Sequence, residues 1–308
     1  MIILVNPRAG AGSGLSRWQK IEPLIRAEFG EVKVVVTNEP EMFRAAVREA
    51  AEGDDPRIVA AGGDGTANAV LNAIVQLDLP HRDRCVLGAI GLGSSNDFHK
   101  PFVDRRMIDR FPTRLAFDRA LMCDVGHVLY SGNGHRGEQF FFLNASAGIT
   151  AEGNARFNTP GPLLKMLKKT DVPAAIAYAA LISLLVYRNQ PVRLTIPALG
   201  TRTIAMTNLG ILKSPHFSGE LHYDVDMNYE NGRFAVVACS DMNIPQRYAL
   251  FRALKHGSLS GLEHVRTWST PVVDVESESP IAIELDGEII TAKKAHFEVR
   301  PRMLKVCP

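Results

Sequence analysis

"RIVAAGGDGTANAVLNAIV", residues 57–75, leads from an apolar run through three glycines into a helical pattern. Residues 57–63 are typical of a strand that is buried on both faces. The apolar residues that follow recur at helical spacing, at Ala67, Val70, Leu71, Ile74 and Val75. Glycines at the end of a strand allow the backbone to approach a bulky or charged ligand. A carboxylate at Asp64 would repel a bound phosphate unless a cation lay between them, so a magnesium nucleotide is the expected ligand.

The first 125 residues repeat this alternation of strand and helix. Apolar runs predict buried strands at residues 2–6, 32–37, 57–63 and 85–93. Strands that are separated by helices imply a parallel sheet with right-handed crossovers, and its ligands bind at the carboxyl ends of the strands. Residues 1–125 are therefore expected to form an α/β nucleotide-binding domain around a parallel sheet.

The pattern changes after residue 125. Short alternating segments predict antiparallel strands at residues 139–146, 191–199, 233–240, 280–291 and 295–301. One helical stretch, at about residues 160–188, interrupts them. The expected fold class is therefore α/β, in which a mostly antiparallel β domain over residues 126–299 follows the parallel-sheet domain.

Composition excludes several classes of protein. The chain of 308 residues has a net charge of +2, which argues against a general nucleic-acid binder. Its four cysteines lie far apart without a CxxC pair, which favours a cytoplasmic protein over a disulfide or zinc framework. The longest apolar run, residues 172–187, is shorter than the roughly 20 residues that cross a bilayer, so no transmembrane segment is expected. The oligomeric state is left open.

Two further glycine loops follow predicted strands. Residues 6–14, NPRAGAGSG, have neither Rossmann nor P-loop spacing, so a tight turn and a phosphate-binding turn are both open. Residues 91–98, GLGSSNDF, place a second carboxylate, Asp97, after the next strand. A third acid, Asp124, follows where the parallel part ends. Two acid-bearing loops on successive strands favour a functional site over ordinary turns.

The order of several motifs resembles one known family. NPRAG, GGDGTAN, GSSNDF, CDVG, FLNASAGITAE and LDGE occur in the order seen in the diacylglycerol kinase catalytic-domain family, which includes bacterial lipid kinases and sphingosine kinases. GGDGT alone is shared with NAD kinases and phosphofructokinases, so the spaced set carries the specificity. The resemblance covers essentially the whole chain. It implies an ATP- and Mg²⁺-dependent kinase of phospholipid metabolism that phosphorylates the hydroxyl of a diacylglycerol-like or sphingoid-like lipid.

The resemblance also implies roles for individual residues. The nucleotide contacts would be Asn6, Pro7, Gly10, Thr37, Gly62, Gly63, Asp64, Gly65, Thr66, Asn68, Ser94 and Asn96, with Ser94 in place of the family's threonine. The metal ligands would be Asp64, Asp97 and Asp124, with Asp64 also counted as catalytic, and Asp286 would be the general base for the lipid hydroxyl. From its residues alone, Asp286 is more typical of a hairpin turn, and the resemblance reverses that preference. Residues 300–308 would return to the first domain.

Three departures from the family pattern matter. Ala69 replaces a glutamate, Gly91 replaces a proline, and Asn231 in "ENGRF" (230–234) replaces an acid of the motif that holds a structural magnesium ion. A neutral amide is a weaker magnesium ligand than a carboxylate. The structural metal is therefore not expected here, whereas the nucleotide site is.

Residues 156–170, RFNTPGPLLKMLKKT, place apolar side chains beside Lys165, Lys168 and Lys169. Such a basic amphipathic segment is typical of contact with an anionic membrane surface, here the inner surface, although packing on the β domain explains it equally well. Two alternative functions stay open: a kinase of a soluble alcohol, as NAD kinases are, and a nucleotide-binding regulatory protein without turnover. Ala69 and Asn231 favour the regulatory protein, and Asp64, Asp97 and Asp286 favour the enzyme.

Overall fold

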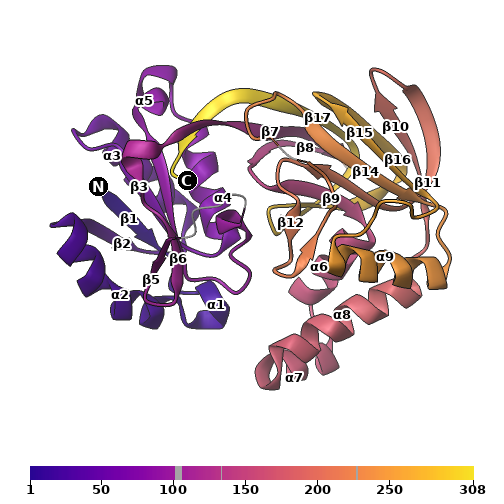
Figure 1. Cartoon of the computed structure of the whole chain (residues 1–308), viewed down its shortest axis with the longest axis horizontal. Helices are drawn as coiled ribbons and strands as arrows, with labels where there is room; N and C mark the ends of the chain where they lie inside the picture. Colours follow the sequence, from indigo (N-terminus) through magenta and orange to yellow (C-terminus); the bar gives the residue numbers. More distant parts are fainter. Residues whose placement is uncertain (101–105, 133, 227) are drawn as a thin grey trace.

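The computed structural model describes residues 1–100, 106–132, 134–226 and 228–308. Its elements form two halves that lie side by side (Figure 1), and strands β7 (Leu121–Gly132) and β17 (Glu288–Val306) run from one half into the other. In the part of the chain that is described, no helix has both the length and the hydropathy to span a bilayer.

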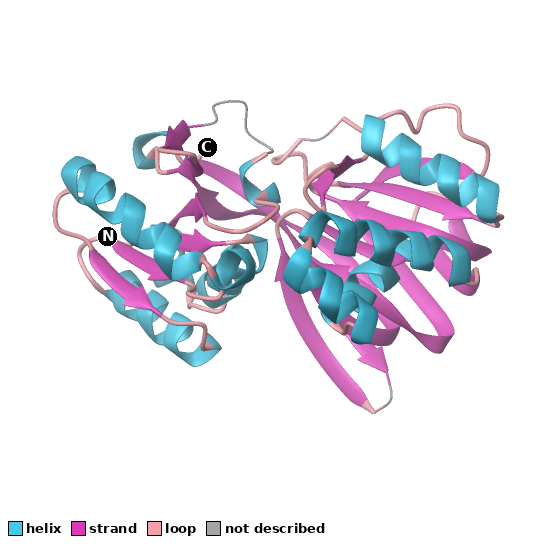
Figure 2. Ribbon diagram, turned by 90° about the horizontal axis from the view of Figure 1, so that it is seen from below, coloured by secondary structure: helices cyan, strands magenta, loops and turns pink. Residues whose placement is uncertain are grey.

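The N-terminal half is built on four parallel strands in the order β2 (Lys33–Val36), β1 (Ile2–Val5), β3 (Arg57–Gly62) and β4 (Val86–Gly91). Its helices are α1 (Ala9–Gly12), α2 (Gly14–Phe29), α3 (Pro40–Glu52), α4 (Asp64–Val75) and α5 (Leu79–Arg84). They lie on both sides of the strands (Figure 2).

Covering both faces explains the continuous apolar run of β1. Ile2 and Leu4 pack into a core with Val70 and Leu71 of α4. Ile3 points to the opposite face, into a second core with Trp18 of α2. Because successive strand residues alternate between faces, a strand that is covered on both sides needs an apolar residue at every position.

The C-terminal half is mostly antiparallel. Besides β7 and β17, its strands are β8 (His135–Phe141), β9 (Asn144–Gly148), β10 (Gln190–Ile196), β11 (Gly200–Leu212), β12 (His216–Phe217), β13 (Leu221–His222), β14 (Phe234–Ser240), β15 (Val265–Thr270) and β16 (Val272–Leu285). Its helices are α6 (Ile149–Asn158), α7 (Pro162–Thr170), α8 (Val172–Val186) and α9 (Ile244–His256). Between β4 and β7 lie short elements of the first half, in which β6 pairs with β4: β5 (Arg106–Ile108), β6 (Phe111–Arg114) and the 3₁₀ turns 97–99 and 117–119. The fold class predicted from the sequence is confirmed.

The last strand returns to the first half. Lys305 and Val306 of β17 pair in parallel with Val86 and Leu87 of β4. Earlier residues of β17 pair with β7 and β16 in antiparallel register. One hydrogen-bonded sheet therefore continues through both halves, and the domain limits at residues 125 and 299 stay predictions.

Two local expectations differ from the structure. The strand expected at residues 139–146 is broken at Phe142 and Leu143, whose amides bind a side chain instead of a strand. The helical stretch at 160–188 is two helices, α7 and α8, preceded by α6, and Asp171 caps α8 by accepting from the Ala174 amide.

Candidate functional site

The glycine loops lie at the carboxyl ends of β1, β3 and β4, as expected. In the middle loop, Gly63 is the N-cap of α4, and Thr66 lies inside the first turn. The Thr66 hydroxyl accepts from Asn6 Nδ2 at 3.0 Å, which joins the first and second loops. A Cβ at Gly62 would lie 2.2 Å from Thr66 Oγ1, so only glycine fits there.

The larger cavity of the site has a volume of about 590 Å³ and opens beside the start of α4. Five predicted nucleotide contacts line it: Asn6, Gly63, Gly65, Thr66 and Asn68. Arg8, Arg44, Gln139 and Glu288 also line it and were not singled out from the sequence. A helix N-terminus with exposed amides and a nearby arginine is suited to an anion.

The other predicted nucleotide residues are not among the residues that line this cavity. Gly10 has a φ of 57°, and Pro7 lies in the same turn. The buried Thr37 hydroxyl accepts from the Glu39 amide at 3.0 Å. Ser94 is exposed, and Asn96 accepts from the Gly93 amide at 3.0 Å. These residues shape the loops around the cavity.

A second cavity, of about 140 Å³, brings acids from distant segments together. Asp64, Asp97, Glu284 and Asp286 line it. Asn68 hydrogen-bonds Asp286 and also lines the larger cavity, so it connects the two. Two of the three acids assigned to the metal and the one assigned as the base thus share one space.

Asp286 occupies a hairpin turn and is nevertheless buried. Its φ is 48° and that of Gly287 is 95°, the backbone of a tight turn between β16 and β17. Its carboxylate accepts from the amides of Phe142 at 2.7 Å, Leu143 at 2.9 Å and Asn144 at 3.1 Å, and from Asn68 Nδ2 at 3.0 Å. Burial raises the pKa of Asp286, and these four donors act in the opposite direction.

Asp64 and Asp97 approach the cavity from the first half. Asp64 Oδ1 accepts from the Phe98 amide at 2.8 Å. Burial, with repulsion from Asp97 as the second cause, raises the pKa of Asp64 to about 7. Asp97 accepts from Lys100 Nζ at 2.5 Å and from the Gly219 amide at 3.0 Å. Lys100 compensates the charge of Asp97, whereas no ion pair among the described residues compensates Asp64, so the cavity can accept a cation.

Glu284 is a site residue that the sequence reasoning missed. It is buried, and its carboxylate accepts from Ser146 Oγ at 2.9 Å. Burial raises its pKa to about 7. A signal was present, because Glu284 lies near the end of β16, two residues before Asp286, and side chains at that spacing along a strand point to the same face.

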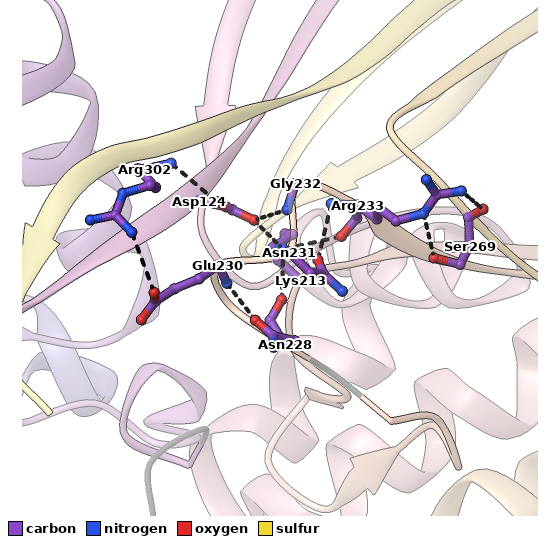
Figure 3. A network of polar contacts seen from close by, with 9 residues as sticks. All are labelled: Asp124, Lys213, Asn228, Glu230, Asn231, Gly232, Arg233, Ser269 and Arg302. Atoms are coloured by element: carbon purple, nitrogen blue, oxygen red, sulfur yellow. Dashed lines mark hydrogen bonds and ion pairs between the residues drawn. The ribbon is translucent and has the colours of Figure 1, made fainter.

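Asp124, the third acid assigned to the metal, lies elsewhere. It is fully buried and lines neither cavity. Its carboxylate accepts from Lys213 Nζ at 2.8 Å, the Gly232 amide at 2.8 Å and the Arg302 amide at 3.0 Å (Figure 3). The expectation that Asp124 joins Asp64 and Asp97 on one metal is corrected here, because Asp124 does not line the cavity that those two acids share. Over the described residues, no three His, Cys, Asp or Glu side chains form a ready metal cluster.

Known proteins resemble this chain in sequence and in fold. Residues 1–127 match the diacylglycerol kinase catalytic domain. The chain is 27% identical over 251 residues, 78% of its length and 72% of the relative's, to a protein of Chromohalobacter salexigens named "Probable lipid kinase YegS-like". It is 34% identical over 123 residues, 40% of its length and 36% of the relative's, to a diacylglycerol kinase of Bacillus subtilis.

The crystal structure of a diacylglycerol kinase from Bacillus anthracis covers 99% of this chain and 95% of that chain, with a TM-score of 0.67 at 17% identity, a likeness of fold. The motif order and the matched region lead to the same family. Through residues 1–127, the chain belongs to the diacylglycerol kinase catalytic domain family.

Proposed function

We propose that this protein is an ATP- and magnesium-dependent lipid kinase that transfers the γ-phosphate to the hydroxyl of a diacylglycerol-like or sphingoid-like lipid. The observation that carries the proposal is the meeting of Asp64, Asp97 and Asp286 at one cavity, next to the larger cavity at the start of α4. Phosphoryl transfer requires a held nucleotide, neutralised phosphate charge and an oriented nucleophile, and this arrangement offers a place for each.

The larger cavity would hold ATP. Its volume of about 590 Å³ is in the range of cofactor sites, and the amides at the start of α4 favour phosphate. Asn6 and Thr66, which are hydrogen-bonded to each other, would fix the two glycine loops against the phosphates. The exposed Arg8 also lines this cavity, and we add it to the residues proposed to contact the phosphates.

Asp64 and Asp97 would hold Mg²⁺ together with the nucleotide. Mg²⁺ usually binds through one or two carboxylates, phosphate oxygens and waters, so the absence of a three-acid cluster among the described residues is compatible with this role. When bound, the ion would neutralise charge on the transferring phosphoryl group. Burial, and repulsion from Asp97 as the second cause, raise the pKa of Asp64 when no cation is bound.

Asp286 would accept the proton of the lipid hydroxyl. Four hydrogen bonds hold its carboxylate in one orientation, which fits a base that must be positioned before reaction. These four hydrogen bonds occupy all four lone-pair sites of the carboxylate. One of them must therefore break before the substrate hydroxyl can bind to Asp286. The Asn68 bond is the one made by a side chain, and it is therefore the one that we expect to exchange.

Glu288 is the second carboxylate that could act as the base. It lies two residues beyond Asp286 and lines the larger cavity. A Cβ at Gly65 would lie 3.1 Å from its Oε1, so it faces the start of α4. Parallel Asp286→Asn and Glu288→Gln variants decide between the two residues.

The lipid would approach from the side of α7 and α8, which project below the C-terminal half in Figure 1. Leu163 and Met166 of α7 and Ile176, Leu181 and Leu185 of α8 are all exposed. Leu164 is buried, whereas Lys165 is exposed; the side chain of Lys169 lies outside the described residues. The segment therefore packs on one face and presents an apolar face on the other, and we propose that this face contacts the inner membrane surface from the cytoplasm.

Helix α6, which packs against α8, is hydrogen-bonded to the hairpin turn of the site. Asn154 Nδ2 of α6 donates to the Gly287 carbonyl at 3.2 Å, next to Asp286.

The deciding experiment measures transfer of labelled γ-phosphate from ATP to a panel of lipids in mixed micelles, with and without Mg²⁺. A magnesium-dependent labelled lipid supports the proposal and identifies the acceptor. ATP binding without any labelled lipid would favour a soluble alcohol or a silent regulatory protein.

A further inference from the structure

Lys213 lies immediately after β11 and carries a fully buried positive charge. Its ammonium donates to Asp124 Oδ2 at 2.8 Å, the Asn228 carbonyl at 2.9 Å and the Arg233 carbonyl at 3.0 Å. A fourth oxygen, Asn231 Oδ1, lies 3.4 Å away. Three short bonds satisfy the three protons of an ammonium, so four oxygens surround one cation that is part of the chain (Figure 3).

The oxygens come from segments that are far apart in the sequence. Asp124 belongs to β7, and residues 228–233 form the loop before β14. Asp124 also accepts from the Gly232 amide of that loop and from the Arg302 amide of β17. Lys213 and Asp124 together therefore tie the loop to β7 and β17, the two strands that run between the halves.

These oxygens are of the kind that bind a hard divalent cation. A carboxylate, two main-chain carbonyls and a side-chain amide form a donor set suited to Ca²⁺ or Mg²⁺. The family resemblance implies a structural magnesium ion beside residues 230–234. The residues present do not fit that ion, because Lys213 Nζ lies among the oxygens and Asn231 supplies no charge.

We propose that Lys213 is a built-in substitute for a bound divalent cation, which makes this loop independent of a structural metal, and that removing its ammonium creates a cation-binding site. The charges agree with this role, since one ammonium balances the one carboxylate of Asp124. The loss of either partner would leave a buried charge without compensation, a strongly destabilising change.

The position of Lys213 connects the substitute to the candidate active site. The Lys213 and Ser214 amides both donate to the Leu143 carbonyl, at 2.8 Å and 2.7 Å. The Leu143 amide in turn donates to Asp286 Oδ1 at 2.9 Å. The segment that carries the Lys213 ammonium is thus hydrogen-bonded to Leu143, whose amide binds the Asp286 carboxylate.

The test compares thermal unfolding of the full chain, without nucleotide, in EDTA, 5 mM CaCl₂ and 5 mM MgCl₂ at about pH 7.5. Lys213→Ala is expected to lower Tm in EDTA by on the order of 5–10 °C. Added Ca²⁺ or Mg²⁺ should restore roughly half of that loss, while wild type shows a clearly smaller rise. Wild type controls for cations that bind at the acid cavity, which both proteins contain.

Further variants separate the proposal from a general stabilisation by cations. In Lys213→Ala/Asp124→Asn the carboxylate is missing, so the restoration should disappear. Lys305→Ala removes a half-buried lysine of β17 that donates to the Asp83 carbonyl, and its response to added cations should equal that of wild type. Should Lys213→Ala fold too poorly, Lys213→Met keeps the packing of the stem, and its soluble yield with and without Ca²⁺ is compared. Equal cation responses of wild type and Lys213→Ala, or of the single and double variants, would overturn the proposal.

Discussion

Asn68 of α4 donates its side-chain amide to Asp286 Oδ2 over 3.0 Å, although 218 residues separate them in the chain. Asn68 lines the larger cavity and Asp286 the smaller one. The bond therefore joins the proposed nucleotide site in the first half to the proposed base in the second. It is also the bond of Asp286 that a substrate hydroxyl can most readily replace, because its donor is a side chain.

Asn68→Ala tests this connection. The variant loses donors to Asp286 and to the Phe140 carbonyl, so we expect a loss of roughly 1–3 kcal/mol in the free energy of unfolding. A fall in kcat of about tenfold or more should accompany it, if the base loses its orientation. Asn189→Ala is the control, because Asn189 also donates its side-chain amide to a main-chain carbonyl, that of Met242, and lines neither cavity. Similar stability losses with equal kcat in both variants would argue against a positioning role.

Asp286→Asn should lower kcat by about 10²–10³-fold while the affinity for ATP stays within about twofold. An amide cannot take the substrate proton, and its NH₂ group would oppose at least one of the donors that now face the carboxylate. Steady-state kinetics and ATP titration measure the two effects separately. An equal loss of ATP affinity, or a larger loss of kcat in Glu288→Gln, would remove Asp286 from the role of base.

Asp64→Asn should abolish magnesium-dependent transfer in a protein that remains folded. In the wild type, Asp64 accepts from the Phe98 amide at 2.8 Å, and the asparagine oxygen can make the same bond. The asparagine side chain has no negative charge with which to bind a cation. Phosphate transfer at increasing MgCl₂, together with a thermal melt, checks both statements. Asp118→Asn, at an exposed acid, serves as control. Retained activity in Asp64→Asn would contradict the proposed metal site.

Stability should fall as the pH rises from about 5 to 7.5 in the absence of divalent cations. The pKa values of Glu284 and Asp64 are raised to about 7 in the folded protein, above their ordinary values of 4.5 and 3.8. Between about pH 4 and pH 7 the folded state binds more protons than the unfolded state. The stabilisation that these two groups contribute is therefore fully present below about pH 4 and is lost as the pH rises through 7.

Glu284→Gln isolates one of these groups. A side chain that stays neutral should flatten part of the slope, by on the order of 2–3 kcal/mol between pH 5 and pH 7.5. Urea unfolding at four or five pH values measures it. A slope equal to that of wild type would mean that Glu284 does not titrate in this range.

Leu163→Asp/Met166→Asp should weaken binding to anionic vesicles and lower the phosphorylation of lipids presented in a bilayer. Both side chains are exposed on α7, at 48% and 56%, and a charge there opposes burial at a membrane surface. Activity on a dispersed short-chain lipid should change little. Leu79→Asp, at a similarly exposed leucine of α5 in the other half, is the control. Equal effects from both substitutions would place the membrane contact elsewhere.

The parallel half was predictable because its signals are local. The apolar run at residues 57–62, the glycines after it and the helical spacing of α4 follow one another in the chain, and each restricts the backbone or its burial directly. The same holds for Asp64 and Asp97, which lie at the ends of adjacent parallel strands. Adjacent parallel strands bring their carboxyl ends to one edge, so the spacing alone brings the two acids together.

The remaining features depended on tertiary contacts. Alternation predicted an unbroken strand at 139–146, but the buried charge of Asp286 requires the amides of residues 142–144, which breaks it. Nothing near Asp124 indicates that Lys213, 89 residues later, neutralises it. Sequence by itself determined the strands, helices and turns whose causes lie within a few residues. Tertiary structure alone decided how each buried charge is compensated, because that compensation comes from whichever donor folding brings within about 3 Å.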